Sequence, residues 1–377
     1  MQRLRHSSVL LIFLFAISFQ ANAQKAQRWP AEKATQWYSS EPWLVGSNFI
    51  PGTAINELEM WQPDTFDPTT IDSELGWAES IGMNTMRVFL HNLLWEQDSK
   101  GFLDRMDKFL EIAAKHHIQI IFVLLDSVWN PYPKLGKQPS PTPHVHNSGW
   151  LQAPGADILK DASRWDKELK PYVVGVLTRF ANDRRVTMWD LMNEPDNTNP
   201  PYKGKELPNK ADLATQLLKR EWQWARGVNP SQPLTSGVWK GDWASDAALE
   251  ETARFQLQNS DVITFHSYDR PEVTRRRIDS LRRFGRPIIC TEYMARPTGS
   301  TFQAILPLLK KEAVGAYNWG LVSGKSQTIY PWISWEKHYT GPPPVWFHDI
   351  FYPDGKPYDP AEVQLIKQLT TTAKAAH

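Results

Sequence analysis

Two glutamates of the chain stand where apolar runs of the sequence stop. The run Val186–Met192 ends in Asn193-Glu194-Pro195, and a second run, Pro287–Glu292, closes on its own glutamate. An amide precedes Glu194, and a proline, which does not continue a helix, follows it. A carboxylate in this position lies at the rim of a sheet rather than on a solvated helix face. Two such carboxylates suit a reaction in which one gives a proton and the other stays ionised.

The elements that must position these glutamates alternate between two kinds of pattern. Eight apolar runs predict strands at Leu44–Phe49, Thr85–Leu90, Ile118–Leu125, Val186–Met192, Pro233–Trp239, Val262–His266, Pro287–Glu292 and Gly315–Leu321. Amphipathic stretches between them predict helices at Thr69–Ile81, Phe102–His116, Glu168–Phe180, Ala211–Arg226, Ala247–Leu257, Pro271–Phe284 and Phe302–Glu312. Continuously apolar strands are typical of a parallel sheet buried on both faces. The sequence therefore predicts an α/β fold, a (β/α)8 TIM barrel forming a single domain over residues 24–377.

Three long loops interrupt the alternation, at about residues 130–165, 196–210 and 323–351. Each follows a predicted strand, so each is expected on the C-terminal face of the barrel, where active sites of this fold are built. The third loop carries Trp332, Trp335 and Trp346. Aromatic residues are scarce in disordered segments, so these loops are predicted to be functional.

The composition indicates which classes of binding partner to expect. Lys and Arg total 42 against 41 Asp and Glu, and this balance favours neither nucleic acid nor an anionic membrane as partner. The chain has 18 Trp. Many should be core, but flat aromatic faces also stack on sugar rings, so the composition is compatible with a carbohydrate-binding protein.

The N-terminus has the features of an export signal. Arg3 and Arg5 precede an apolar stretch, 9–19, and Ala21-Asn22-Ala23 fits a cleavage site, so residues 1–23 are predicted to be a signal peptide. The stretch is too short to span a bilayer. We therefore expect a secreted or periplasmic protein without a membrane span. The chain has a single cysteine, Cys290, so it cannot form an internal disulfide. We expect the protein to be a monomer.

Polar side chains stand at the ends of most predicted strands. They are Asn48, Arg87, His91, Asp126, Asn193, Glu194, His266, Tyr268, Glu292 and Trp319. Their order and spacing resemble the retaining (β/α)8 glycoside hydrolases of clan A, with the nearest likeness to the cellulase-like family 5. The resemblance spans about residues 43–321. It rests on Arg87, Asn193-Glu194, His266-x-Tyr268, Glu292 and Trp319.

The resemblance implies a role for each matched residue. Glu292 is the expected nucleophile and Glu194 the expected acid/base, about 5–5.5 Å apart in a retaining enzyme. Arg87 and Tyr268 would keep Glu292 ionised by opposite charge and hydrogen bonding. Asn193 would hold the sugar 2-hydroxyl, and His266 and Trp319 would contact the sugar, with Trp319 as its floor. The implied substrate is a β-linked oligo- or polysaccharide, and no cofactor is needed.

One departure from family 5 concerns the third strand. Cellulases of that family carry a histidine just beyond the aspartate, whereas this chain continues Asp126-Ser127-Val128-Trp129-Asn130. Either another group, such as His91, Asp126 or Asn130, binds the sugar hydroxyl, or the substrate differs. The sugar, the linkage and the choice between internal and terminal cleavage stay open.

Three other functions compete with this one. His144-Val145-His146 has metal-ligand spacing and His91, Asp126 and His266 lie at strand ends, so a metal-dependent barrel hydrolase is one alternative. A non-catalytic carbohydrate-binding barrel fits the tryptophans equally well, although both glutamates are intact. A transglycosylase would use the same residues.

Overall fold

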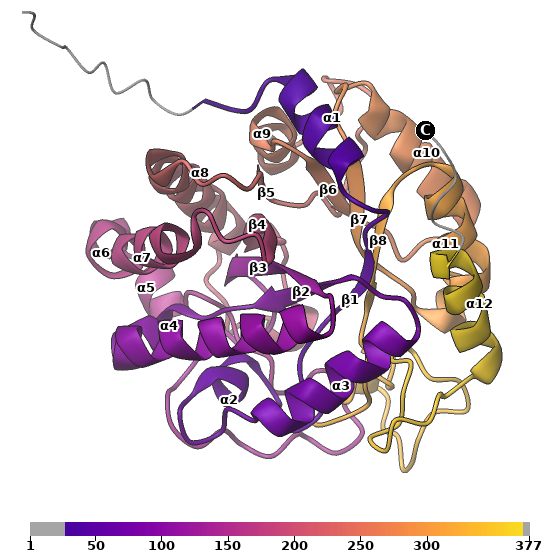
Figure 1. Cartoon of the computed structure of the whole chain (residues 1–377). Coiled ribbons are helices and arrows are strands. Elements are labelled where there is room, and N and C mark those ends of the chain that lie inside the picture. The colour runs from indigo at the N-terminus through magenta and orange to yellow at the C-terminus, as the bar shows by residue number, and fades with distance from the viewer. Residues whose placement is uncertain (1–26, 372–377) are drawn as a thin grey trace, which may run out of the picture.

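A closed barrel of parallel strands forms the centre of the molecule (Figure 1). The computed structural model describes residues 27–371. All eight strands pair in parallel in the order β5-β4-β3-β2-β1-β8-β7-β6. A parallel bridge from Val238 to Phe265 joins the two outer strands and closes the barrel. The strands are β1 Val45–Asn48, β2 Thr85–Phe89, β3 Gln119–Asp126, β4 Val186–Asn193, β5 Leu234–Thr235, β6 Ile263–His266, β7 Ile288–Tyr293 and β8 Gly315–Trp319.

The barrel has an apolar core on each side of its wall. Inside, side chains from six strand regions meet in one cluster, composed of Leu44, Ile121, Met188, Val262, Ile289 and Tyr317. Outside, a larger cluster that includes Ile120 and Phe122 packs between strands and helices. Neighbouring positions of β3 thus face opposite cores, and both are apolar. This explains why the strands read as continuous apolar runs, and the predicted (β/α)8 barrel is confirmed.

Helices surround the barrel. They are α1 Ala31–Ser40, α2 Glu57–Trp61, α3 Pro68–Ser80, α4 Asn92–Lys115, α5 Ala156–Leu159, α6 Ala162–Arg164, α7 Lys170–Phe180, α8 Lys210–Val228, α9 Glu251–Asn259, α10 Pro271–Arg282, α11 Phe302–Lys311 and α12 Pro360–Thr371. All seven predicted helices are present within a few residues of their expected ends, except that α4 begins at Asn92 rather than Phe102. Its backbone leaves helical geometry at Asp98, where the helix kinks.

Two outer helices occupy segments for which the sequence predicted no element. In α1, Trp37 and Tyr38 pack against the inner cluster of the barrel, and the Tyr38 hydroxyl donates to the carbonyl of Ala313 at 3.0 Å. In α12, Glu362 pairs with the buried Arg296 at 2.6 Å. In α12, Val363, Ile366 and Leu369 recur at helical spacing and pack on the outer core, so this helix does have an apolar face.

Strand β5 is shorter than predicted, because only Leu234–Thr235 of the run Pro233–Trp239 pairs with β4. Beyond it the chain crosses to β6 through Gly237. A side-chain carbon at Gly237 would lie 3.2 Å from Oγ1 of Thr264, so this close approach favours glycine. The crossing completes the barrel.

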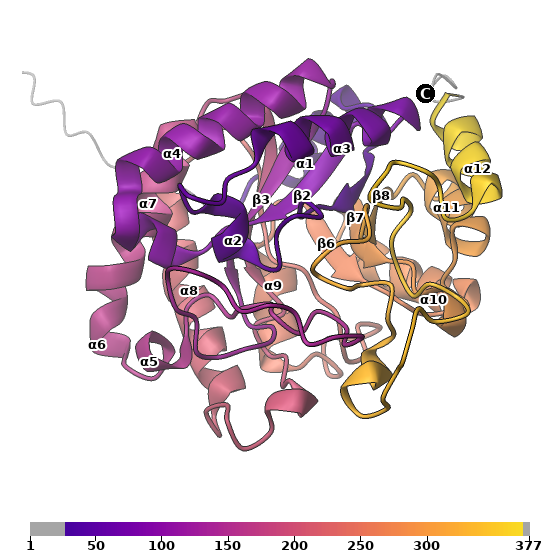
Figure 2. The same cartoon turned by 90° about the horizontal axis from the view of Figure 1, so that it is seen from below.

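The long loops after β3, β4 and β8 gather at one end of the barrel, as the sequence predicted (Figure 2). The base of the β8 loop is held by Arg296, whose guanidinium donates to the carbonyls of His348 at 2.6 Å and Asp349 at 2.7 Å. No helix between residues 27 and 371 has the length and apolarity needed to cross a membrane. The predicted signal peptide, residues 1–23, lies outside the described residues.

Candidate active site

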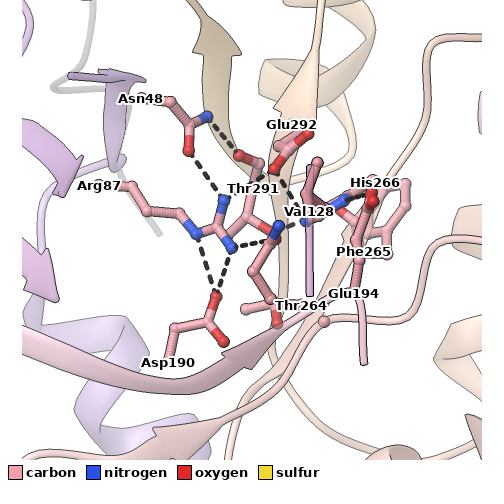
Figure 3. A network of polar contacts seen from close by, with 12 residues as sticks. Asn48, Arg87, Val128, Asp190, Glu194, Thr264, Phe265, His266, Thr291 and Glu292 are labelled. Carbon is pink, nitrogen blue, oxygen red and sulfur yellow. Dashed lines mark hydrogen bonds and ion pairs between the residues drawn. The ribbon is translucent and has the colours of Figure 1, made fainter. Parts of the chain in front are cut away.

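A buried arginine organises the floor of the barrel mouth (Figure 3). Arg87, on β2, is fully buried. Its Nε and Nη2 donate to Oδ2 of Asp190 at 3.0 and 2.8 Å. Its Nη1 donates to Asn48 at 2.8 Å and to Oε1 of Glu292 at 2.9 Å, and Nη2 also donates to Oδ1 of Asn193 at 2.8 Å. One guanidinium therefore orients polar side chains from β1, β4 and β7.

The two predicted catalytic carboxylates face each other across this floor. One oxygen of Glu194, one oxygen of Glu292 and one ring nitrogen of His266 all lie within 4.8 Å of one another. The Tyr268 hydroxyl donates to Oε2 of Glu292 at 2.7 Å. Nδ1 of His266 lies 2.7 Å from Oε1 of Glu194, and its Nε2 lies 3.6 Å from Oε1 of Glu292. This separation is nearer to the about 5–5.5 Å of retaining carboxylate pairs than to the about 6.5–9.5 Å of inverting pairs.

The protonation of the pair differs between its members. The pKa of Glu194 is raised to about 7, chiefly by burial and also by the charge of Asp196, while the hydrogen bond from the Asn197 amide acts in the opposite direction. Burial also raises the pKa of Glu292 and the charge of Glu194 adds to it, whereas His266, Arg87 and Tyr268 lower it. Burial lowers the pKa of His266 to about 4, so the imidazole is neutral at pH 7. With a pKa of about 7, Glu194 can both hold and release a proton near neutral pH, whereas Arg87 and Tyr268 favour the ionised form of Glu292.

The backbone at Glu194 adopts an uncommon conformation. Its φ of 41° lies in the left-handed region, which non-glycine residues seldom adopt. The Nδ2 of Asn197, one turn further along, donates to Oε2 of Glu194 at 2.5 Å. Strained backbone of this kind concentrates at functional sites.

A tryptophan is the partner of the third-strand aspartate, beside which family 5 cellulases carry a histidine. The Trp150 indole donates to Oδ2 of Asp126 at 2.7 Å, and Nδ2 of Asn193 donates to its Oδ1 at 3.0 Å. The carbonyl of Asn193 accepts from Arg87 and one of its amide hydrogens is donated to Asp126, so the second amide hydrogen is available to a ligand in the site.

A cavity of about 510 Å³ opens above the pair. Six of the predicted site residues line it, namely Asn193, Glu194, His266, Tyr268, Glu292 and Trp319. Five further tryptophans line the cavity. Trp129, Trp150, Trp332 and Trp335 come from the segments that follow β3 and β8, and Trp239 follows β5. An apolar cavity with a few convergent polar groups is the usual form of a ligand site.

Four predicted site residues do not line this cavity. Arg87, Asn48 and Asp126 lie behind it and hold the lining residues in place. His91 is further removed, because its Nδ1 accepts from the backbone N–H of Leu93 at the start of α4 and its Nε2 contacts the carbonyl of Gln152. The structure therefore gives His91 a helix-capping position rather than the predicted contact with a sugar.

Sequence reasoning gave no role to several residues that complete the site. Asp190 is the clearest, since it is fully buried and accepts two hydrogen bonds from Arg87. A charged residue inside the apolar run of β4 was the available signal. Asn197 and Trp150 lie in loops, where no periodicity marks them.

The residues proposed for a metal site are separate from one another. Both His144 and His146 contact Tyr330, through its hydroxyl and carbonyl respectively. Within residues 27–371, the group with metal-ligand spacing is Glu194, His266 and Glu292. Its carboxylate oxygens already engage Arg87, Tyr268, His266 and Asn197, and a guanidinium 2.9 Å from Glu292 disfavours a second cation.

Fold and site together define a class, the (β/α)8 barrels with a pair of buried glutamates at the carboxyl ends of β4 and β7. No family model matches the chain. A curated relative, the mannan endo-1,4-beta-mannosidase of Mytilus edulis, is 26% identical over 208 residues, which are 48% of this chain and 52% of the relative. The match thus spans about half the length of that relative.

Solved structures of similar fold cover most of the chain. GH5_18 from Streptomyces cattleya, in complex with GlcNAc, superposes with a TM-score of 0.58 at 11% identity, covering 88% of this chain and 81% of that one. The exo-beta-1,4-mannosidase Op5Man5 from Opitutaceae bacterium strain TAV5 gives a TM-score of 0.58 at 19% identity, covering 88% and 60%. The resemblance to family 5 barrels that the motifs indicated is therefore confirmed in the fold.

Proposed function

We propose that the protein is a retaining β-glycosidase with Glu292 as nucleophile and Glu194 as acid/base. The observation that carries this proposal is the pair itself: two buried carboxylates with oxygens within 4.8 Å of each other, one of them beside Arg87 and Tyr268. The similarity to mannosidases and to family 5 structures supports it.

The reaction proceeds in two displacements. An ionised oxygen of Glu292 attacks the anomeric carbon, the bond to the leaving oxygen breaks, and Glu194 gives that oxygen its proton. Water then attacks the glycosyl ester, its proton passes to Glu194, and Glu292 leaves as a carboxylate. The hydrogen bonds from Arg87 and Tyr268 stabilise Glu292 before attack and after release. Glu194 is suited to both proton transfers, because its pKa of about 7 lies near working pH.

We further propose a β-1,4-linked mannose-containing glycan as substrate. The curated relative is an endo-1,4-beta-mannosidase and one similar structure is an exo-beta-1,4-mannosidase. The altered third-strand position, where Trp150 contacts Asp126, is consistent with a sugar other than that of cellulases. An exported location, as the N-terminal sequence suggests, suits a substrate outside the cell.

Trapping the intermediate tests this function. A 2-fluoro-β-mannosyl donor with a good leaving group is expected to inactivate the protein and to leave its sugar on Glu292, located by peptide mass spectrometry. An NMR time course with an aryl β-mannoside is expected to show the β-anomer as first product. Labelling of another residue, or the α-anomer appearing first, would refute the mechanism. A panel of β-glucosides, xylosides and mannosides tests the sugar separately.

A further inference from the structure

The loops after β3 and β8 are joined to each other across the barrel mouth, and this junction closes one side of the cavity. We call it the loop bridge, residues 142–150 and 326–334. The N–H of Asn147 donates to the carbonyl of Ser326 at 2.8 Å, and that of His146 donates to Oγ of Ser334 at 2.8 Å. Figure 2 shows the two loops approaching each other.

The side chain of Gln327 stabilises the bridge with three hydrogen bonds. The Gln327 amide accepts from the N–H of His144 at 2.8 Å and donates to the carbonyls of Thr142 at 2.6 Å and Val145 at 3.2 Å. Tyr330 adds contacts to both histidines of the β3 loop. β1 and β2 lie between β8 and β3 in the barrel. The bridge contacts the segment that follows β1, where Nδ2 of Asn56 donates to the carbonyl of Gly149 at 3.0 Å.

Aromatic rings fill the space beneath the bridge. Trp150 lies edge-on to Phe89 and to Trp319, with ring centroids 5.1 and 5.6 Å apart, and Phe89 is 5.7 Å from Trp319. The gap that remains between them, lined also by Asn48, holds about 10 Å³. This is about the space of one water molecule, far too little for a sugar ring.

The opposite side of the cavity, here called the open side, is formed by the segments that follow β4 and β5. It is bounded by residues 197–201 of the β4 loop and by Trp239. Trp335 lies between the two sides, because its ring centroid is 5.7 Å from that of Tyr202 in the β4 loop and 5.7 Å from that of Trp129. The Trp129 ring is in turn 6.2 Å from the His146 ring of the bridge. Ile333, a residue of the bridge that lines the cavity, is 48% exposed. Exposed apolar groups at a cavity rim are typical of a binding surface.

The catalytic geometry orients the substrate between these two sides. In the proposed mechanism the sugar bound to Glu292 on β7 would lie over Trp319 on the neighbouring β8, and the leaving oxygen would lie towards Glu194, which follows β4. The blocked side is therefore where a second sugar, beyond the one attacked, would extend. The open side receives the leaving group.

We infer that the protein cleaves only at the non-reducing end and releases one sugar at a time, an inference that rests on the proposed function. The cavity accepts a single sugar on the Glu292 side, so that sugar must be terminal. The rest of the glycan extends towards residues 197–201 and Trp239. The loop bridge thus excludes internal cleavage by steric conflict rather than by chemistry.

The test uses β-1,4-mannohexaose labelled at its reducing end, with cellohexaose and xylohexaose in parallel in case the sugar differs. The full-length protein is expected to release unlabelled monosaccharide and, in order, the labelled penta-, tetra- and trisaccharide. Unlabelled di- or trisaccharide released from the start would overturn the inference while leaving the glycosidase proposal intact. Absence of both hydrolysis and 2-fluoro labelling would refute the proposed function, and the inference with it.

Two variants test the cause. Trp150→Ala removes the ring that fills the blocked side, and it is expected to raise the share of released disaccharide about tenfold or more, because the excluded second sugar gains room. Trp150→Phe is the matched control, since it loses the bond to Asp126 but keeps a ring, and it is expected to release monosaccharide. Gln327→Ala removes the three hydrogen bonds of this side chain across the bridge and changes neither glutamate. It is expected to shift the products in the same direction as Trp150→Ala. If Trp150→Ala and Gln327→Ala both fold and still release only monosaccharide, the proposed cause is wrong.

Discussion

The pair of Arg87 and Asp190 gives the sharpest quantitative prediction. Both side chains are fully inaccessible to solvent, and Oδ2 of Asp190 accepts from Nε at 3.0 Å and from Nη2 at 2.8 Å. Asp190→Asn keeps the shape and removes the charge. Breaking a buried ion pair costs about 3–5 kcal/mol, and Coulomb's law for charges about 4 Å apart at an effective dielectric of about 20 gives a similar 4 kcal/mol.

The same substitution acts on the reaction. In the free protein Arg87 faces two carboxylates, and in the glycosyl intermediate Glu292 is an uncharged ester, so Asp190 alone balances the guanidinium. Without it, attack by Glu292 leaves a buried charge unpaired. A cost of about 3–4 kcal/mol at this step corresponds to labelling by the 2-fluoro donor that is about 10²–10³-fold slower.

Urea unfolding and the rate of 2-fluoro labelling measure the two effects. The matched control is Glu111→Gln, which breaks a surface pair with Lys108 whose side chains are 57% and 55% exposed and should change stability by less than about 1 kcal/mol. If Asp190→Asn is no less stable than this control and is labelled at the wild-type rate, the buried-charge argument is wrong.

The remaining predictions concern the glutamates directly. Glu292→Ala is expected to abolish turnover of aryl glycosides while leaving the circular dichroism spectrum unchanged; retained turnover would contradict its role. The kcat/KM is expected to fall as pH rises through about 7, because Glu194 must be protonated to act as acid and loses its proton there. Asn197→Ala is expected to move that limb to higher pH, since the amide lowers the pKa of Glu194. Full activity in EDTA is expected, and loss restored by a metal would favour the metal-dependent alternative.

The barrel and the six cavity-lining residues could be predicted from the sequence because both follow from strand ends. Each predicted strand is buried on two faces, so a continuous apolar run identifies it in the sequence. The first polar residue after the run lies at the mouth of the barrel. Glu194 and Glu292 are found by this rule. It fails for His91, which also follows a strand but begins α4, where its ring nitrogen accepts a backbone N–H.

The loop partners could not be predicted in this way. Trp150 reaches Asp126 across 24 positions of a loop without periodicity, and the bridge depends on hydrogen bonds from backbone groups that carry no sequence signal. Whether the loops frame a cleft or wall off a pocket, which stays open in the sequence, is decided by contacts such as those of Gln327.

The wall of the cavity is restrained at both of its ends. Arg296 holds the base of the β8 loop through the carbonyls of His348 and Asp349, and Gln327 holds its far part to the β3 loop. Ordering a backbone residue costs about 1–2 kcal/mol of conformational entropy. Here that cost is met when the chain folds rather than when a sugar binds. A glycan therefore meets a wall that is already shaped, and its binding entropy should depend on the loss of its own freedom and on the water it displaces.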